Sequence, residues 1–345
     1  MRILHLAAGN RWTGAAAPAF AEVEALRAAG VDAHYAYVGG YKLQAKIGHH
    51  DFAHPIIEKA QNPVSFVRSI NAVDRLLRVH GFDVVHAHLT YDHWLARIAA
   101  REHPNVRLAR TFHSRRVLRN DPLSRSLLRA TQQLFVVNRA FDVPGAVFTP
   151  PPIDHRQFHP LGPKIDIPKI DIEGPLVTVI GKLSKHRGFE EALQTFGSLR
   201  RLASCRMMII GHGEHRPALE ALSRDLGVAD DVIWAGYHED DLSEHYRASS
   251  LLLFTARGSD EGHRAVLEAM ACGVPVATMP IEGIDALVPR EWIAASQDPE
   301  ALAKTAADLF AHPPAGVYER SLEFGYDRAA ERLIAAYEGI IPTTS

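Results

Sequence analysis

The segment "GSDEGHRAVLEAMACGVPVA", residues 258–277, places acidic and glycine residues where a strand is expected to meet a helix. The apolar run 251–256 predicts the strand, and the helix is expected to begin near His263. The first turn of a helix carries unpaired N–H groups and the positive end of the dipole, which favour phosphate or sugar oxygens. Asp260 and Glu261 can accept strong hydrogen bonds from hydroxyl groups. The segment therefore indicates a site for a hydroxyl-rich or phosphate-bearing ligand.

Glu268 lies two turns into the same predicted helix, among Ala, Val, Leu and Met. A lone carboxylate with apolar neighbours is costly unless it has polar partners. Two interpretations stay open on spacing alone. Glu268 either accepts hydrogen bonds from two hydroxyls of a ribose or is an ordinary solvent-facing glutamate.

Short apolar runs alternate with amphipathic helical stretches along the chain, which is typical of a parallel sheet built from βαβ units. The predicted strands lie at 2–8, 32–38, 83–88, 107–113, 134–138, 176–183, 206–213, 231–237 and 251–256. A segment rich in proline and charge interrupts this alternation near residues 160–175. We therefore expect an α/β protein of two doubly wound domains, 1–162 and 175–325, joined by a linker at 163–174. Ligands are expected at the carboxyl ends of the strands, facing a cleft between the domains.

Composition and charge narrow the class of protein. The 345 residues are 47% hydrophobic and 23% charged, as in ordinary globular proteins. Residues 1–160 hold 20 Lys and Arg against 12 Asp and Glu, whereas the remainder holds 18 against 28. A basic half favours an anionic partner, although a chance spread of solvated charge remains open. The overall charge of −2 and the lack of a nucleic-acid motif argue against nucleic acid.

Cysteine use and apolar runs bear on location. Cys205 and Cys272 lie in a predicted strand and a predicted helix, outside any metal-ligand spacing, so we expect reduced thiols in a cytoplasmic protein. Residues 2–8 read as a strand rather than a signal peptide. No apolar run approaches the roughly 18 residues that span a bilayer. Any work on membranes would take place at their inner face.

The array "D-x7-E-A-M-A-C-G-V-P-V", Asp260–Val276, resembles the acid-x7-Glu motif of retaining GT-B glycosyltransferases of family 4. "VIGKLSKHRGFEEAL" is similar to that family's phosphate-binding strand-loop-helix, and "DVVHAH", "RTFHS" and "PPPIDHRQFHP" stand where it has related stretches. Most members have Glu-Gly-Phe-Gly where this chain has "DEGH", so Asp260 replaces the first acid and His263 a glycine. The resemblance implies two Rossmann-like domains, with a final helix at about 326–341 packing back on the first.

The resemblance also implies roles for individual residues. Lys182 and Arg187 would stabilise the departing diphosphate together with the start of the helix at Gly262 and His263. Asp260, and alternatively Glu261, would bind sugar hydroxyls, and Glu268 the ribose. Gly14 would allow close approach of the first strand-helix turn, and His113 would lie near the donor sugar. The resemblance thus implies catalytic roles for His113, Lys182 and Arg187. It implies donor-binding roles for Gly14, Asp260, Glu261, Gly262, His263 and Glu268.

The implied reaction moves a sugar, with retention, from a UDP- or GDP-linked donor to a hydroxyl of a glycan, a lipid-linked or a small-molecule acceptor. No Asp-x-Asp pair occurs in the sequence, so the resemblance implies neither a metal nor another cofactor. A non-catalytic nucleotide-sugar or glycan-binding protein and a sugar-nucleotide epimerase remain alternatives. A dinucleotide-dependent dehydrogenase is disfavoured because no G-x-G-x-x-G opens the first helix.

The run "HSRRVLRNDPLSRSLLR" concentrates arginines in the basic half. They could meet anionic lipid headgroups or the phosphates of an acceptor, or simply form a solvated helix face. The residues concerned are Arg115, Arg116, Arg119, Arg125 and Arg129.

Overall fold

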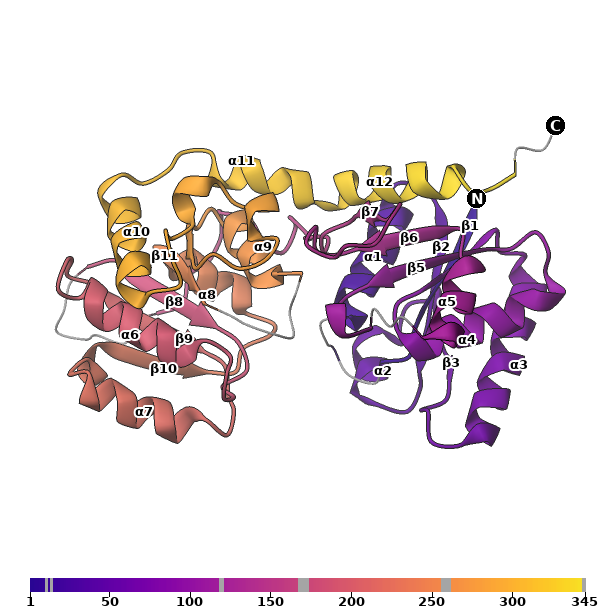
Figure 1. The fold of residues 1–345 in the computed structure, drawn as a ribbon, viewed down its shortest axis with the longest axis horizontal. Helices are drawn as coiled ribbons and strands as arrows, with labels where there is room; N and C mark the ends of the chain where they lie inside the picture. Colours follow the sequence, from indigo (N-terminus) through magenta and orange to yellow (C-terminus); the bar gives the residue numbers. More distant parts are fainter. Residues whose placement is uncertain (10–11, 13–14, 118–120, 167–173, 256–261, 343–345) are drawn as a thin grey trace. The chain divides into compact units, whose positions relative to one another are not determined.

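The computed structural model describes residues 1–342 except 10–11, 13–14, 118–120, 167–173 and 256–261. It divides the chain into two compact units (Figure 1). The first unit contains Met1–Pro152 and Phe324–Ser345, and the second contains Ile153–Glu323. Each is a parallel α/β unit, so the expected fold class is confirmed.

The first unit is built on a seven-stranded parallel sheet of order β3-β2-β1-β4-β5-β6-β7. Its strands are β1 (Arg2–Ala7), β2 (Asp32–Val38), β3 (Ala53–Ile57), β4 (Val84–Ala87), β5 (Arg107–Phe112), β6 (Gln133–Val136) and β7 (Val147–Phe148). Its helices are α1 (Ala16–Ala28), α2 (Lys42–Ile47), α3 (Pro63–His80), α4 (Thr90–Ala99), α5 (Pro122–Arg129) and α12 (Tyr326–Glu338). The final helix α12 packs along α1 although almost the whole chain separates them (Figure 1).

Alternating side chains of β1 divide the core of this unit between two faces. Ile3 packs with residues of α1 and α12, whereas Leu4 and Leu6 pack with residues of α3 and α4. Because successive side chains of a strand point to opposite faces, His5 shares the face of Ile3. His86 on the neighbouring strand pairs with His5 and lies on the same face of the sheet.

The second unit is built on a five-stranded parallel sheet of order β10-β9-β8-β11-β12. Its strands are β8 (Leu176–Ile180), β9 (Arg206–Ile210), β10 (Val232–Gly236), β11 (Leu251–Phe254) and β12 (Val276–Thr278). Its helices are α6 (Phe189–Leu199), α7 (Arg216–Asp225), α8 (Leu242–Ala248), α9 (Arg264–Ala271), α10 (Pro299–Ala311) and α11 (Val317–Ser321). The strands β8, β9 and β11 begin inside the stretches expected from apolar runs.

The boundary between the units lies after Pro152, not after residue 162 as expected from the sequence. The segment 153–162 belongs to the second unit because its side chains and carbonyls contact α8. The ring of Phe158 lies 6.2 Å from that of Tyr246, and the Nη1 atom of Arg247 donates to the carbonyl of His159 at 3.4 Å. The proline-rich segment therefore packs on the second unit as well as connecting the two units.

Candidate functional site

Glu268 is buried at the centre of α9, with 4% of its surface exposed. Its Oε1 atom lies 2.7 Å from the Nε atom of Arg264, one turn earlier on the same helix. Its Oε2 atom accepts a hydrogen bond of 3.2 Å from the hydroxyl of Tyr246 on α8. Burial raises the pKa of Tyr246 well above its ordinary value, so the hydroxyl keeps its proton and donates. The solvent-facing interpretation of Glu268 is therefore wrong, and the carboxylate is held in a fixed orientation.

The residue before α9, His263, has a left-handed backbone with φ of 52°. Such values are uncommon outside glycine, although histidine adopts them more readily than most residues. A glycine would adopt this conformation without the steric cost of a Cβ atom. His263 is buried, and its Nε2 atom lies 3.1 Å from the carbonyl oxygen of Glu282. Gly262 is buried beside it, whereas Asp260 and Glu261 lie outside the described residues.

Lys182 and Arg187 lie in the loop between β8 and α6, where Lys182 is exposed and Arg187 half-buried. The loop closes through Gly188, which has φ of 84° and packs directly on β11. A Cβ atom at Gly188 would lie 2.0 Å from the carbonyl oxygen of Thr255, so only glycine fits. Thr255 in turn donates to the carbonyl of Gly188 at 2.7 Å. The loop that carries Lys182 and Arg187 is thus fixed to the end of β11, the strand that precedes residues 256–261.

A second loop at the carboxyl edge of this sheet was not identified from the sequence. It follows β9, and a Cβ atom at Gly211 would meet the carbonyl oxygen of Gly181 at 1.8 Å. The Nε2 atom of His215 at its end lies 2.6 Å from Oε1 of Glu190 on α6. The two glycines of "GHGEHR" were the available signal, since glycine marks a close approach of backbones. The structure shows that these glycines bring the β8 and β9 loops together.

His113 follows β5 in the first unit and belongs to a chain of histidines. Its Nε2 atom lies 3.0 Å from Nδ1 of His88. Its Nδ1 atom is buried and has no hydrogen-bond partner among the described residues. Burial, with a smaller effect from the nearby Arg110 charge, lowers the pKa of His113 to about 3. His113 is therefore neutral near pH 7, and the protein groups of the described chain leave its Nδ1 atom without a partner.

Arg110 is another polar residue of this region that the sequence did not single out. It lies on β5 and is buried, and its Nε and Nη1 atoms lack partners within the described part of the chain. Burial lowers its pKa to about 10, which the nearby Asp92 carboxylate partly offsets. The alternation of "RLARTF" contained the signal, since Arg110 shares the inward face of Leu108 and Phe112. Gly14, which sequence reasoning placed near this end of the sheet, lies outside the described residues.

Two groups of side chains in the described parts of both units have donor sets that suit a metal ion. One consists of His5, Glu22, His86 and His88 in the first unit, and all four are buried. The other consists of His238, Asp241 and His245 in the second unit. Neither group was identified from sequence spacing.

Comparison with known protein families assigns both units. Residues 12–142 match the model described as "Glycosyltransferase Family 4", and residues 174–312 match that of "Glycosyl transferases group 1". A glycosyltransferase structure from Rickettsia africae is similar over 99% of both chains, with a TM-score of 0.82 and 15% identity. Each half of the chain thus matches a glycosyltransferase family model, and the whole chain has the GT-B fold. The resemblance seen in the sequence is confirmed at this level.

Other similar proteins carry more specific names. The Anabaena protein HepE, solved in complex with UDP, has a TM-score of 0.77 at 14% identity, over 99% of this chain and all of HepE. The 2-deoxystreptamine glucosyltransferase of Streptomyces kanamyceticus is 27% identical over 49% of this chain and 46% of its own length. The D-inositol 3-phosphate glycosyltransferase of Xylanimonas cellulosilytica is 27% identical over 55% of this chain and 48% of its own. The chain thus spans about half the length of these curated relatives.

The arginines noted in the sequence lie in the first unit, after β5 and on α5. Arg115, Arg116, Arg125 and Arg129 are exposed, and Arg119 lies outside the described residues. Arg115 also donates to the carbonyl of Ala140 at 2.7 Å, so part of this basic surface is structural. Among the described helices, none combines the length and apolar character needed to cross a membrane.

The first unit also contains a surface cavity of about 880 Å³ between the segments 39–44 and 55–68. Its lining includes Tyr41, Lys59, Asn62 and Arg68, so charged and hydrogen-bonding groups face it. Sequence reasoning found no motif in this region. The cavity is lined by β-strand ends and by the start of α3, which are positions that no short motif brings together.

Proposed function

We propose that this protein is a retaining glycosyltransferase that moves a sugar from a nucleoside-diphosphate donor to an acceptor hydroxyl. The observation that carries this proposal is the held carboxylate of Glu268, buried on α9. This helix is the next one after β11, and the loop of Lys182 and Arg187 is fixed to the end of β11 through Gly188. A carboxylate fixed by Arg264 and Tyr246 still has lone pairs with which to accept two ribose hydroxyls. The matches of both halves to glycosyltransferase family models support this assignment.

The proposed roles follow the chemistry of each residue. Breaking the bond between the anomeric carbon and the diphosphate leaves negative charge on phosphate oxygens. Lys182, Arg187 and the N–H groups at the start of α9 would stabilise that charge as preorganised donors, without a catalytic metal ion. Neither Lys182 nor Arg187 forms an ion pair with any described residue, so both cations are available to an anion. Asp260 or Glu261 would bind sugar hydroxyls.

His113 is proposed to contact the donor sugar through its unpartnered Nδ1 atom. A neutral imidazole suits hydrogen bonding to a hydroxyl or to the ring oxygen, because it adds no charge that must be desolvated. Gly14 is proposed to let the first strand-helix turn approach the donor or the acceptor. In this retaining reaction the departing phosphate accepts the proton of the acceptor hydroxyl.

The proposed donor is UDP- or GDP-linked, and UDP is the first to test because HepE was solved with it. The acceptor is proposed to be a glycan, a lipid-linked sugar or a small polyhydroxy compound. The names of the Streptomyces and Xylanimonas relatives favour beginning with small cyclic polyols. A cytoplasmic location, including the inner face of the membrane, is proposed from the basic arginine surface.

A nucleotide panel followed by product analysis tests the function. Thermal unfolding is measured with UDP, GDP, ADP, CMP and NAD, on wild type, on Glu268→Ala and on Glu291→Gln, which changes an exposed glutamate of the same unit. Ligand at 100 times its Kd adds about 2.7 kcal/mol of stability, so binding is readily seen. We expect a shift with one nucleoside diphosphate that Glu268→Ala loses and Glu291→Gln keeps.

The corresponding donor sugar is then incubated with and without cyclitol and oligosaccharide acceptors, and the product is analysed by NMR. A new glycoside with the anomeric configuration of the donor supports the proposal. An inverted glycoside would contradict retention, and a changed nucleotide sugar formed without acceptor would indicate an epimerase. Binding without turnover of any donor would indicate a non-catalytic protein.

A further inference from the structure

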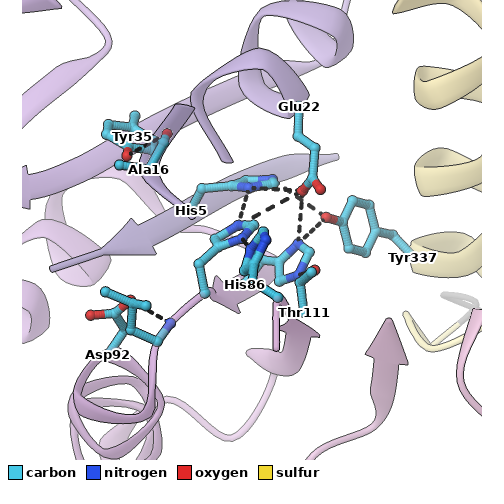
Figure 2. A network of polar contacts seen from close by, with 11 residues as sticks. His5, Ala16, Glu22, Tyr35, His86, Asp92, Thr111 and Tyr337 are labelled. Carbon is cyan, nitrogen blue, oxygen red and sulfur yellow. Dashed lines mark hydrogen bonds and ion pairs between the residues drawn. The ribbon is translucent and has the colours of Figure 1, made fainter. Parts of the chain in front are cut away.

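Three histidines and one glutamate of the first unit converge in its core. Figure 2 shows His5 on β1, Glu22 on α1 and His86 on β4 directed toward one another. β1 and β4 pair in register, with His5 opposite His86. Because alternate residues share a face of a sheet, His88 continues the line of His86 toward α1. All four side chains are buried.

The hydrogen bonds of the three imidazoles do not include Glu22. His86 is bonded on both sides, to the hydroxyl of Tyr337 at 2.6 Å and to that of Thr111 at 2.7 Å. The Nδ1 atom of His5 and the Nε2 atom of His88 lie 2.9 Å apart. One of these two nitrogens must donate and the other accept when no ion is present.

The Oε2 atom of Glu22 has no hydrogen-bond partner among the described residues, although the side chain is only 1% exposed. It lies 3.6 Å from Nδ1 of His5, 3.7 Å from Nε2 of His88 and 3.9 Å from Nδ1 of His86. These separations are too long for hydrogen bonds, whether the carboxyl is charged or protonated. Such an orphaned buried oxygen calls for a ligand at the centre of the cluster.

We propose that this cluster binds a divalent transition-metal ion of the Zn²⁺ class through His5 Nδ1, His88 Nε2 and Glu22 Oε2. The three distances of 2.9, 3.6 and 3.7 Å between these atoms place a point about 2.0 Å from each of them. Zinc bonds to imidazole nitrogen and carboxylate oxygen measure about 2.0–2.2 Å. Imidazole and carboxylate donors also match the ligand preference of this class of ion. Further, the ion supplies the partner that Glu22 lacks.

His86 Nδ1 completes a four-coordinate set. It lies within the same group of ligand atoms, all of them within 4.8 Å of one another. On coordination His86 gives up its bond to the hydroxyl of Tyr337. That hydroxyl lies 3.4 Å from Nε2 of His5, so its oxygen can accept a hydrogen bond from the Nε2–H group that His5 has once Nδ1 binds the ion. Metal-bound histidines ordinarily donate through their other nitrogen in this way.

The ion would join elements that are far apart in the sequence. It would connect β1, β4 and α1 directly, and α12 through Tyr337, so it would stabilise the first unit as a whole. Because binding to the folded state alone adds stability, metal at 100 times its Kd should raise the melting temperature of this unit by roughly 5–10 °C. The ion is structural in this proposal and is separate from the diphosphate chemistry proposed above.

The group of His238, Asp241 and His245 provides a matched control within the same chain. Asp241 already contacts His238 at 2.9 Å, and its side chain is 44% exposed. Its oxygens therefore have a partner and water, unlike Oε2 of Glu22. A chain that binds metal nonspecifically would use this second group at least as readily.

The test uses untagged full-length protein, stripped of metal with a chelator and titrated with Co²⁺ and then Zn²⁺. Four variants are compared with wild type, namely Glu22→Gln, His88→Gln, His238→Gln and Asp241→Asn. Visible absorption of Co²⁺ reports four-coordinate geometry, and elemental analysis after dialysis reports stoichiometry. Circular dichroism and thermal unfolding, with and without metal, establish that each variant is folded.

We expect one equivalent of Co²⁺ with a tetrahedral spectrum, displaced by Zn²⁺, and a higher melting temperature in the presence of metal. Glu22→Gln and His88→Gln should weaken metal binding by roughly 100-fold or more, whereas His238→Gln and Asp241→Asn should not change it. Wild-type protein that takes up no stoichiometric Co²⁺ overturns the proposal without reference to any variant. Uptake that survives Glu22→Gln but is lost in His238→Gln overturns it equally.

Discussion

Substitution of Glu268 by glutamine separates nucleotide recognition from the stability of α9. Glutamine keeps the size of the side chain, and its carbonyl oxygen can still accept from Tyr246. It replaces charge-assisted hydrogen bonds of about 1.5–3 kcal/mol with neutral ones of about 0.5–1.5 kcal/mol. For two ribose hydroxyls the loss is about 2–3 kcal/mol, or roughly 30- to 150-fold in the Kd of the nucleoside diphosphate.

The assay compares two ligands by calorimetry, the nucleoside diphosphate selected by the panel and inorganic pyrophosphate. Pyrophosphate carries the charge that Lys182 and Arg187 would bind but has no ribose. Its Kd should therefore change little in Glu268→Gln, while that of the nucleotide rises. Arg264→Gln is the control for loss of the ion pair, since it leaves the Glu268 carboxylate in place.

Equal weakening of both ligands would refute the ribose assignment, because it would mean that Glu268 only holds the start of α9 in shape. Unchanged nucleotide affinity in a folded variant would refute it more directly. In either case the burial of Glu268 would be explained by Arg264 and Tyr246 alone.

Three further predictions concern the first unit. His113→Ala should lower kcat by roughly 100-fold while the nucleotide Kd stays unchanged in calorimetry, and equal turnover would exclude a role at the donor sugar. Burial lowers the pKa of His93 from 6.5 to about 3. As the pH falls, the unfolded state therefore takes up a proton before the folded state does. About 2 kcal/mol of the free energy of unfolding is lost in this way between pH 7 and pH 5. His93→Gln, which can keep the bond to Thr131, should remove that part of the loss in urea unfolding, and an unchanged pH dependence would contradict the assignment. Wild-type protein should float with anionic vesicles in low salt only, and the double variant Arg125→Glu, Arg129→Glu should not float with them. Flotation of the wild type with neutral vesicles or in high salt would rule out charge-driven binding.

Most of the sheet of each unit could be predicted from the sequence, because a buried parallel strand is a contiguous apolar run. The strand β3 could not, since His54 and Pro55 interrupt "AHPII" at the edge of the first sheet. Edge strands tolerate proline, so their sequences resemble loops. The boundary at Pro152 was missed for a related reason. Contacts of Phe158 with a distant helix, rather than local composition, decide which unit the segment joins.

The residues of the candidate site also differed in whether the sequence could predict them. Glu268 could be located because its helix, its glycine stop and its spacing from Asp260 lie in one short segment. The partners that bury it could not, since Tyr246 comes from another helix. The metal cluster was invisible for the same physical reason. His5, Glu22 and His86 are brought together by strand register and helix packing, and no local spacing records either.

Hydrogen bonds connect His5 to His113 through His88. In neutral rings the links His5–His88 and His88–His113 allow two patterns of donors and acceptors. If His5 Nδ1 donates to Nε2 of His88, then Nδ1 of His88 donates to Nε2 of His113, and Nδ1 of His113 carries a hydrogen. If His5 Nδ1 accepts, Nδ1 of His113 is a lone pair. An ion held by His5 Nδ1 and His88 Nε2 replaces the link between these two nitrogens, since neither carries a proton when coordinated. His88 then carries its proton on Nδ1 and donates to Nε2 of His113, so Nδ1 of His113 carries a hydrogen as in the first pattern. Occupancy at Glu22 would thus decide whether His113 offers its ligand a donor or an acceptor.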